Sequence, residues 1–144
     1  KGIFENTVYP GILELLTKLK EQGFIIGLAT SKPEKFAEII LEKLGIDKYF
    51  DKICGASLDQ SRSEKIDVMK YVLEELGVTN HKEVLMIGDR MYDINASNEL
   101  GIDSVGVLFG FGSYEEFEAS GSCTRSHYYQ KENSSLPLPY SCQE

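Results

Sequence analysis

Short apolar runs alternate along the chain with longer stretches whose apolar positions repeat at helical spacing. Continuous apolar runs suit strands covered on both faces, and they occupy residues 24–29, 84–87 and 104–108, with a shorter candidate at 52–54. Helices are expected at Pro10 to Gly23, Pro33 to Gly45, Ser63 (as N-cap) to Gly77, and Ile94 to Gly101. The residues expected on their inward faces are Ile12, Leu13, Leu15, Leu16, Leu19, Phe36, Ile39, Ile40, Leu44, Ile66, Met69, Leu73 and Leu76. The alternation predicts an α/β fold, a Rossmann-like parallel sheet with helices on both faces.

The length of 144 residues suggests one domain with a hydrophobic core. The alternating pattern continues to about residue 121, and no apolar period is found from Ser122 onward. We therefore expect an α/β core over residues 1–121 and an irregular tail over residues 122–144.

The net charge of −8 argues against nucleic acid or an anionic membrane as a partner, because both require basic surface. The cysteines, Cys54, Cys123 and Cys142, form no CxxC pair, so a zinc site is not expected, and their odd number fits a reducing compartment. No run approaches the length of a membrane span and no signal peptide is recognised, so a cytoplasmic location is expected.

Candidate chemistry lies where the apolar runs end. In open parallel sheets, ligands bind beyond the carboxyl ends of the strands. The run at 24–29 ends in Thr30 and Ser31, whose hydroxyl and N–H groups could hold phosphate oxygens, assisted by the dipole of the helix that follows. The run at 84–87 leads to Asp89 and Asp93, which could hold Mg²⁺. If the two strands are neighbours, these residues converge on one site.

Lys65 completes the candidate set. It lies in the first turn of its predicted helix, where a cation is unfavourable by the dipole argument, and a functional role at the phosphate site would explain that conflict. Arg62 is the second candidate for the same role.

Each of these residues also has a structural interpretation. Thr30 and Ser31 are common turn and cap residues, and Lys65 is typical of a solvated helix surface. Asp89 and Asp93 could cap the helix that follows them. The glycines at 110 and 112 lack the third glycine and following helix of a dinucleotide fingerprint and are expected in a turn, and Cys54 is expected in the core.

The order of these residues resembles the haloacid dehalogenase-like hydrolase superfamily, in particular its phosphoglycolate phosphatase-like branch. The likeness covers about residues 5–121, and the segments that carry it are 9–16, 27–37, 62–65, 88–93 and 109–116. The hydroxyl residue of the second family motif falls on Thr30, with Ser31 beside it, and the lysine of the third motif falls on Lys65. The acidic fourth motif falls on Asp89 and Asp93.

The resemblance implies a Mg²⁺-dependent phosphatase that acts on a small phosphorylated substrate through an aspartyl-phosphate. It assigns the phosphoryl oxygens to Thr30 and Ser31, charge balance and orientation of the nucleophile to Lys65, and the metal to Asp89 and Asp93. The family's first motif, with its nucleophilic aspartate, and the cap domain are expected before Val8. The resemblance therefore implies that the core is truncated and that this chain is inactive alone.

Phosphoglycolate is the first substrate expected, with nucleoside monophosphates and pyrophosphate as alternatives. Two other hypotheses remain open. The chain could bind phosphate or a partner without turnover, or it could be a doubly wound domain whose aspartates only cap a helix. Because the first strand is expected to be missing, we also predict that the isolated chain is poorly soluble, self-associating or only partly ordered. The oligomeric state is left open.

Overall fold

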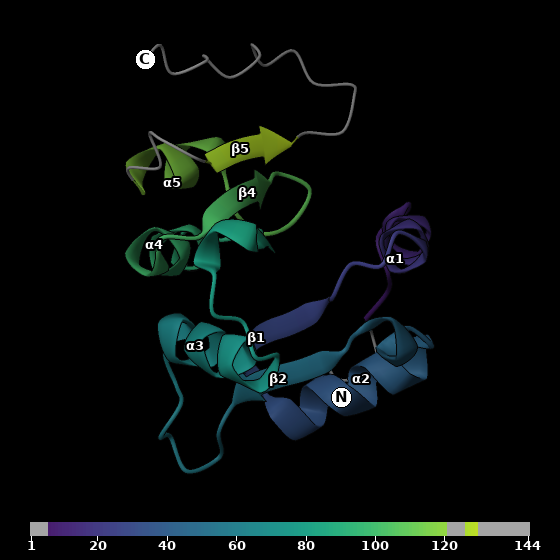
Figure 1. Ribbon diagram of the computed structural model, residues 1–144. Coiled ribbons are helices and arrows are strands. Elements are labelled where there is room, and N and C mark those ends of the chain that lie inside the picture. Colours follow the sequence, from purple (N-terminus) through teal and green to yellow (C-terminus); the bar gives the residue numbers. More distant parts are fainter. Residues whose placement is uncertain (1–5, 121–125, 130–144) are drawn as a thin grey trace. The chain divides into compact units, whose positions relative to one another are not determined.

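The computed structural model describes residues 6–120 and 126–129 (Figure 1). The chain divides into two compact units, Lys1–Thr79 and Asn80–Glu144, here called unit 1 and unit 2. Each unit is described by itself.

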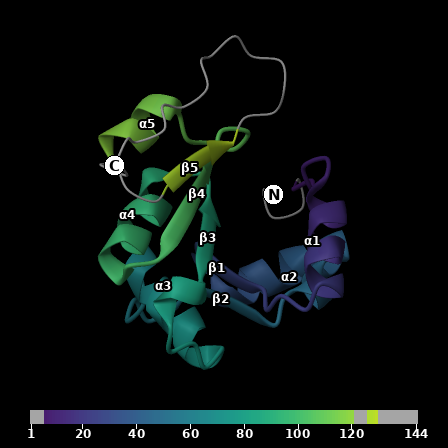
Figure 2. The same cartoon turned by 45° about the horizontal axis from the view of Figure 1, so that its top comes forward.

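Unit 1 is built around a parallel pair of strands. Its elements are α1 (Ile12–Glu21), β1 (Gly27–Pro33), α2 (Glu34–Leu44), the 3₁₀ turn η2 (Asp47–Tyr49), β2 (Lys52–Ala56) and α3 (Lys65–Glu75). β1 pairs with β2 in parallel, and Leu28 lies opposite Ile53. Figure 2 shows the two strands side by side, with α2 and α3 packed around them.

Two apolar clusters cover the two faces of this pair. Leu28 and Ile53 pack against the cluster that contains Leu16, Leu41 and Ile46, which comes from α1, α2 and the segment after α2. The next residues along the strands pack on the other side: Cys54 forms a buried cluster with Val68 and Val72 of α3, and Ala29 packs against this cluster. Successive residues of a strand point to opposite faces, so this alternation shows that helices cover both faces of the pair. The burial of Cys54, 1% exposed, confirms its expected place in the core.

The buried stripes of α1 and α2 are narrower than the sequence pattern predicts. Four residues expected to face inward are exposed by 38–50%: Leu13, Leu15, Phe36 and Ile39. That part of the prediction is wrong for the described structure. Two strands lie about 4.8 Å apart, whereas a helix with its side chains is about 10 Å wide, so the pair covers only the central residues of each helix.

Unit 2 contains a parallel sheet of three strands within its described residues. Its elements are η3 (His81–Glu83), β3 (Leu85–Gly88), α4 (Met91–Leu100), β4 (Asp103–Val107), α5 (Tyr114–Ala119) and β5 (Ser126–Tyr129). The strand order is β3-β4-β5, and Gly88 of β3 lies opposite Gly106 of β4. Ile94 and Phe117 are fully buried here, in α4 and α5. Parallel strands alternating with helices confirm the predicted α/β class.

Several boundaries differ from those predicted. β1 continues through Thr30 to Pro33, α3 has Glu64 and not Ser63 at its N-cap, and α4 begins at Met91 rather than Ile94. The predicted irregular tail is wrong for residues 126–129, which form β5 against β4. The remainder of residues 122–144 lies outside the described structure. Within the described ranges, none of the helices combines the length and the apolar character that crossing a bilayer requires.

Candidate functional site

Thr30 and Ser31 lie in an irregular part of β1. Ala29 pairs with Cys54 and Pro33 pairs with Ala56, so β1 advances four residues while β2 advances two. Such a mismatch makes a strand bulge, which re-aims its side chains. The Thr30 hydroxyl oxygen accepts a hydrogen bond from the backbone N–H of Lys32 (3.2 Å). Thr30 is half-buried and Ser31 is exposed, so the bulge presents polar groups at the end of the strand.

Lys65 is brought to the same end of β1. It is the first residue of α3, and its ammonium group donates a hydrogen bond to the carbonyl oxygen of Ala29 (2.9 Å), the residue directly before Thr30. This contact offsets the unfavourable position of a cation in the first turn of a helix. Unit 1 therefore brings together the predicted lysine and the predicted hydroxyl segment.

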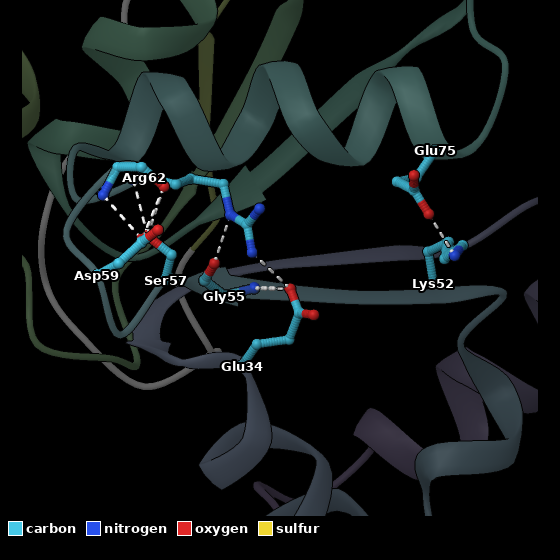
Figure 3. Close-up of polar contacts among 8 residues, drawn as sticks. Glu34, Lys52, Gly55, Ser57, Asp59, Arg62 and Glu75 are labelled. Carbon is cyan, nitrogen blue, oxygen red and sulfur yellow. Dashed lines mark hydrogen bonds and ion pairs between the residues drawn. The ribbon is translucent and has the colours of Figure 1, made fainter.

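The guanidinium group of Arg62, the second candidate for the role of Lys65, is held by three structural contacts. Its Nε donates to the carbonyl oxygen of Gly55 (2.8 Å) and its Nη2 donates to Glu34 Oε2 (2.9 Å), as Figure 3 shows. The guanidinium carbon also lies 3.7 Å from the centre of the Tyr71 ring. These contacts favour Lys65 over Arg62 as the cation offered to a ligand.

Asp89 follows β3 and is bound by the loop between β4 and α5. Its Oδ2 accepts a hydrogen bond from the backbone N–H of Phe111 (2.9 Å). A Cβ atom at Gly110 would overlap the Asp89 carboxylate, and one at Gly112 would overlap the Asp89 carbonyl oxygen. A turn at residues 108–109 continues into a bend that contains Gly110, and Gly112 lies in irregular backbone just after it. No local pattern indicated that the glycines make room for Asp89, and the short helix α5 that follows them was not expected.

Asp93 has a structural role in the first turn of α4. Its side chain is buried, and its Oδ2 accepts a hydrogen bond from the backbone N–H of Arg90 (3.2 Å). A Cβ atom at Gly88 would overlap this side chain, so the glycine that ends β3 makes room for Asp93. The capping interpretation therefore holds for Asp93, while Asp89 is bound instead by the loop after β4.

Glu116 of α5 is a residue of this region that the sequence reasoning missed. Its Oε1 accepts hydrogen bonds from Arg90 Nε (2.8 Å) and from the backbone N–H of Met91 (2.9 Å). The Arg90 guanidinium and then the Met91 N–H lower the pKa of the Glu116 carboxyl. Ser113 accepts a hydrogen bond from the Glu116 N–H, so a serine followed three residues later by glutamate was the available helix-start signal. Glu116 thus fixes the segment that joins Asp89 to α4.

The donor set in unit 2 suits Mg²⁺. Magnesium takes oxygen ligands and usually binds through one or two carboxylates together with water and substrate oxygens. Asp89 and Asp93 supply two carboxylates, each packed against a glycine. Within residues 6–120 and 126–129, no group of three or more His, Cys, Asp or Glu side chains forms a fuller ligand set. The convergence of these aspartates with Thr30 and Lys65, which belong to unit 1, stays a prediction.

Comparison with known proteins finds relatives that are named as a nucleotidase and as phosphatases. The 5'-nucleotidase of Pseudomonas aeruginosa is 39% identical over 118 residues, which are 82% of this chain and 53% of that protein. The phosphoglycolate phosphatase of Escherichia coli is 32% identical over 137 residues, 93% of this chain and 53% of that protein. The crystal structure of a predicted phosphatase from Clostridium acetobutylicum matches with a TM-score of 0.83 and 44% identity, over 90% of this chain and 59% of that one.

The Clostridium structure shares the α/β fold of this chain. The chain spans about half the length of the curated relatives described above. The family model for the haloacid dehalogenase-like hydrolases matches residues 4–107, which include the β1 bulge, Lys65, Asp89 and Asp93. The chain belongs to the haloacid dehalogenase-like hydrolase family.

Proposed function

We propose that this chain supplies the phosphate-binding and metal-binding core of a Mg²⁺-dependent phosphatase that acts on a small phosphorylated metabolite. The observation that carries the proposal is the hydrogen bond from Lys65 Nζ to the Ala29 carbonyl oxygen, which places a cation beside Thr30. A positive charge beside hydroxyl and backbone N–H donors suits the equatorial oxygens of a transferring phosphoryl group. Membership of a hydrolase family supports the same conclusion.

The proposed role of each residue follows from the chemistry of its side chain. Thr30 and Ser31 hold phosphoryl oxygens, and Lys65 balances the negative charge that the phosphoryl group carries as its bond to the leaving oxygen breaks. Asp89 and Asp93 hold Mg²⁺, which when bound neutralises phosphoryl oxygens and helps to align the group for in-line attack. Glu116 and Arg90 keep the Asp89 segment fixed at the start of α4.

The substrate proposed first is phosphoglycolate. One relative of comparable similarity is named phosphoglycolate phosphatase and another is named 5'-nucleotidase, so a nucleoside monophosphate is the nearest alternative and pyrophosphate is the third. Measuring kcat/KM for these three substrates determines which of them the protein prefers. A preference for a nucleoside monophosphate of tenfold or more over phosphoglycolate would replace the first choice.

A binding role without turnover is the second candidate. In that case the protein binds orthophosphate and Mg²⁺ with measurable heat but releases no phosphate from any ester.

The test of the proposed function is phosphate release from p-nitrophenyl phosphate by the complete protein that carries this sequence, with and without Mg²⁺. Hydrolysis is expected only with Mg²⁺, and Asp89→Asn is expected to abolish it. Glu99→Gln is the control, because Glu99 is an exposed acid at the far end of α4. Unchanged turnover in Asp89→Asn would end the proposal.

A further inference from the structure

Arg62 joins three segments of unit 1 that lie far apart in the sequence. It extends from the loop between β2 and α3 to the carbonyl oxygen of Gly55 in β2, to Glu34 at the start of α2, and to the ring of Tyr71 in α3. Its side chain is 20% exposed and that of Glu34 is 33% exposed, so the ion pair is partly shielded from water. We propose that Arg62, anchored by Glu34, is the positioning residue that holds Lys65 against the end of β1.

The position of Lys65 depends on the loop before α3, because that loop determines where the helix begins. The N-cap residue Glu64 makes no side-chain capping hydrogen bond. Arg62, three residues before Lys65, is tied to Ser57 through two hydrogen bonds: the Ser57 N–H donates to the Arg62 carbonyl oxygen (3.0 Å), and the Arg62 N–H donates to Ser57 Oγ (2.9 Å). The loop is therefore anchored at Arg62, and only Ser63 and Glu64 lie between this anchor and Lys65.

Glu34 connects this anchor to the segment that carries Thr30. It is the first residue of α2, and its Oε2 accepts hydrogen bonds both from Arg62 Nη2 and from the backbone N–H of Gly55 (3.1 Å). A Cβ atom at Gly55 would overlap the Lys32 carbonyl oxygen and the start of α2, so β2 fits closely against the end of the bulge. The contacts of Arg62 thus set the position of Lys65 relative to Thr30.

This role predicts a specific kinetic signature and rests on the proposed function of Lys65. A catalytic group displaced by about 1 Å can lose about a hundredfold in rate, while ground-state binding of the substrate changes less. Arg62→Met should therefore lower kcat and leave KM nearly unchanged. Because Arg62 acts through Lys65, its loss should cost little in a protein that has already lost Lys65.

The experiment is a double-mutant cycle on p-nitrophenyl phosphate hydrolysis by the complete protein that carries this sequence. Arg62→Met is expected to lower kcat about tenfold to a hundredfold with KM within threefold, and to change kcat less than twofold in the Lys65→Met background. Arg62→Lys keeps the charge near Glu34 and should recover part of the loss. Lys52→Met removes the other ion pair drawn in Figure 3, with Glu75, and should leave kcat within twofold.

Equal losses from Arg62→Met in both backgrounds, or wild-type kcat in Arg62→Met, would overturn the positioning role. If Lys65→Met is fully active, the role assigned to Lys65 fails, and the positioning role fails with it. If the wild-type protein hydrolyses no ester, the proposed function fails. The ¹³C NMR signal of reductively methylated Lys65 then tests whether Arg62 holds Lys65 in place. That signal should shift in Arg62→Met and not in Lys52→Met, and an unchanged signal in both would overturn it.

Discussion

The ammonium group of Lys65 and the carbonyl oxygen of Ala29 are joined by a 2.9 Å hydrogen bond between α3 and β1. The contact fixes a positive charge one residue before Thr30, at the place where the register between β1 and β2 becomes irregular. A cation at this position is unfavourable for α3 itself. Its presence is explained if the ammonium group serves a negatively charged ligand at the end of the strand.

Replacement of Lys65 by methionine should separate function from stability. The change removes the hydrogen bond to the Ala29 carbonyl oxygen, worth about 1 kcal/mol. It also removes an unfavourable helix-end charge worth about 0.3–1 kcal/mol, so these two effects nearly cancel. The free energy of unfolding in urea should change by less than about 1 kcal/mol, while kcat falls about a hundredfold or more. Loss of stability and activity together would indicate that Lys65 acts by stabilising the folded protein.

Gly110→Ala should weaken the binding of Mg²⁺. The added methyl group would overlap the Asp89 carboxylate and push it away from its hydrogen bond with the Phe111 N–H. Disturbing the contacts that orient a metal ligand typically costs about 10–100-fold in affinity, and isothermal titration with Mg²⁺ measures it.

The control for this change is Gly11→Ala. Gly11 has a positive φ, so alanine strains its backbone, but no atom lies within 4 Å of the added methyl group, and it lies in unit 1. It should leave the affinity for Mg²⁺ unchanged. Equal affinities in Gly110→Ala and the wild type would show that Asp89 does not hold the metal.

Glu116 should make the stability of unit 2 depend on pH. Hydrogen bonds from Arg90 and from the Met91 N–H lower the pKa of Glu116 below its usual value of 4.5. Its contribution is therefore fully present above that value and is lost as the pH falls through the lowered folded-state pKa. Glu116→Gln should reduce the free energy of unfolding by about 1 kcal/mol at pH 7 and by less at pH 3. A deficit of equal size at both pH values would contradict this account.

The exposed apolar face of β3 should make the isolated chain associate with itself. Leu85 and Ile87 alternate onto one face of the strand and are 55% and 50% exposed. Among the described residues, β3 pairs on one side only, with β4. Unpaired strand edges with apolar side chains promote association.

Sedimentation velocity of the 144-residue chain tests this prediction. Species larger than a monomer are expected in the wild-type chain, and the combined change Leu85→Lys and Ile87→Lys should reduce them. A monomer with a sharp unfolding transition would argue against the prediction.

Local chemistry made much of the fold predictable. Gly45 and Gly101 end α2 and α4 in the left-handed conformation that the sequence led us to expect. The end of β1 was mispredicted because Thr30 lies in a bulge, which depends on the pairing with β2 and not on the local sequence. The same limit applies to the inward faces of α1 and α2, because the width of the sheet decides which residues are covered.

The sequence selected candidate site residues but not the contacts that they make. The helix-dipole conflict and the family resemblance selected Lys65, and the structure places its ammonium group beside the Thr30 segment. No local pattern could pair Arg62 with Glu34, because 28 positions separate them and only the packing of α2 against β2 brings them together. Glu116 could have been found, since Ser113 and Glu116 have the spacing of a capping box.

In the proposed function, Thr30, Lys65, Asp89 and Asp93 together handle one phosphoryl group and one divalent ion. The most direct measurement replaces Mg²⁺ by paramagnetic Mn²⁺ in the complete protein and follows the loss of backbone amide NMR signals. We expect the signals of Thr30 and Lys65 to broaden together with that of Asp89, and Asp89→Asn to restore all three. Broadening near Asp89 with full signals at Thr30 and Lys65 would contradict it.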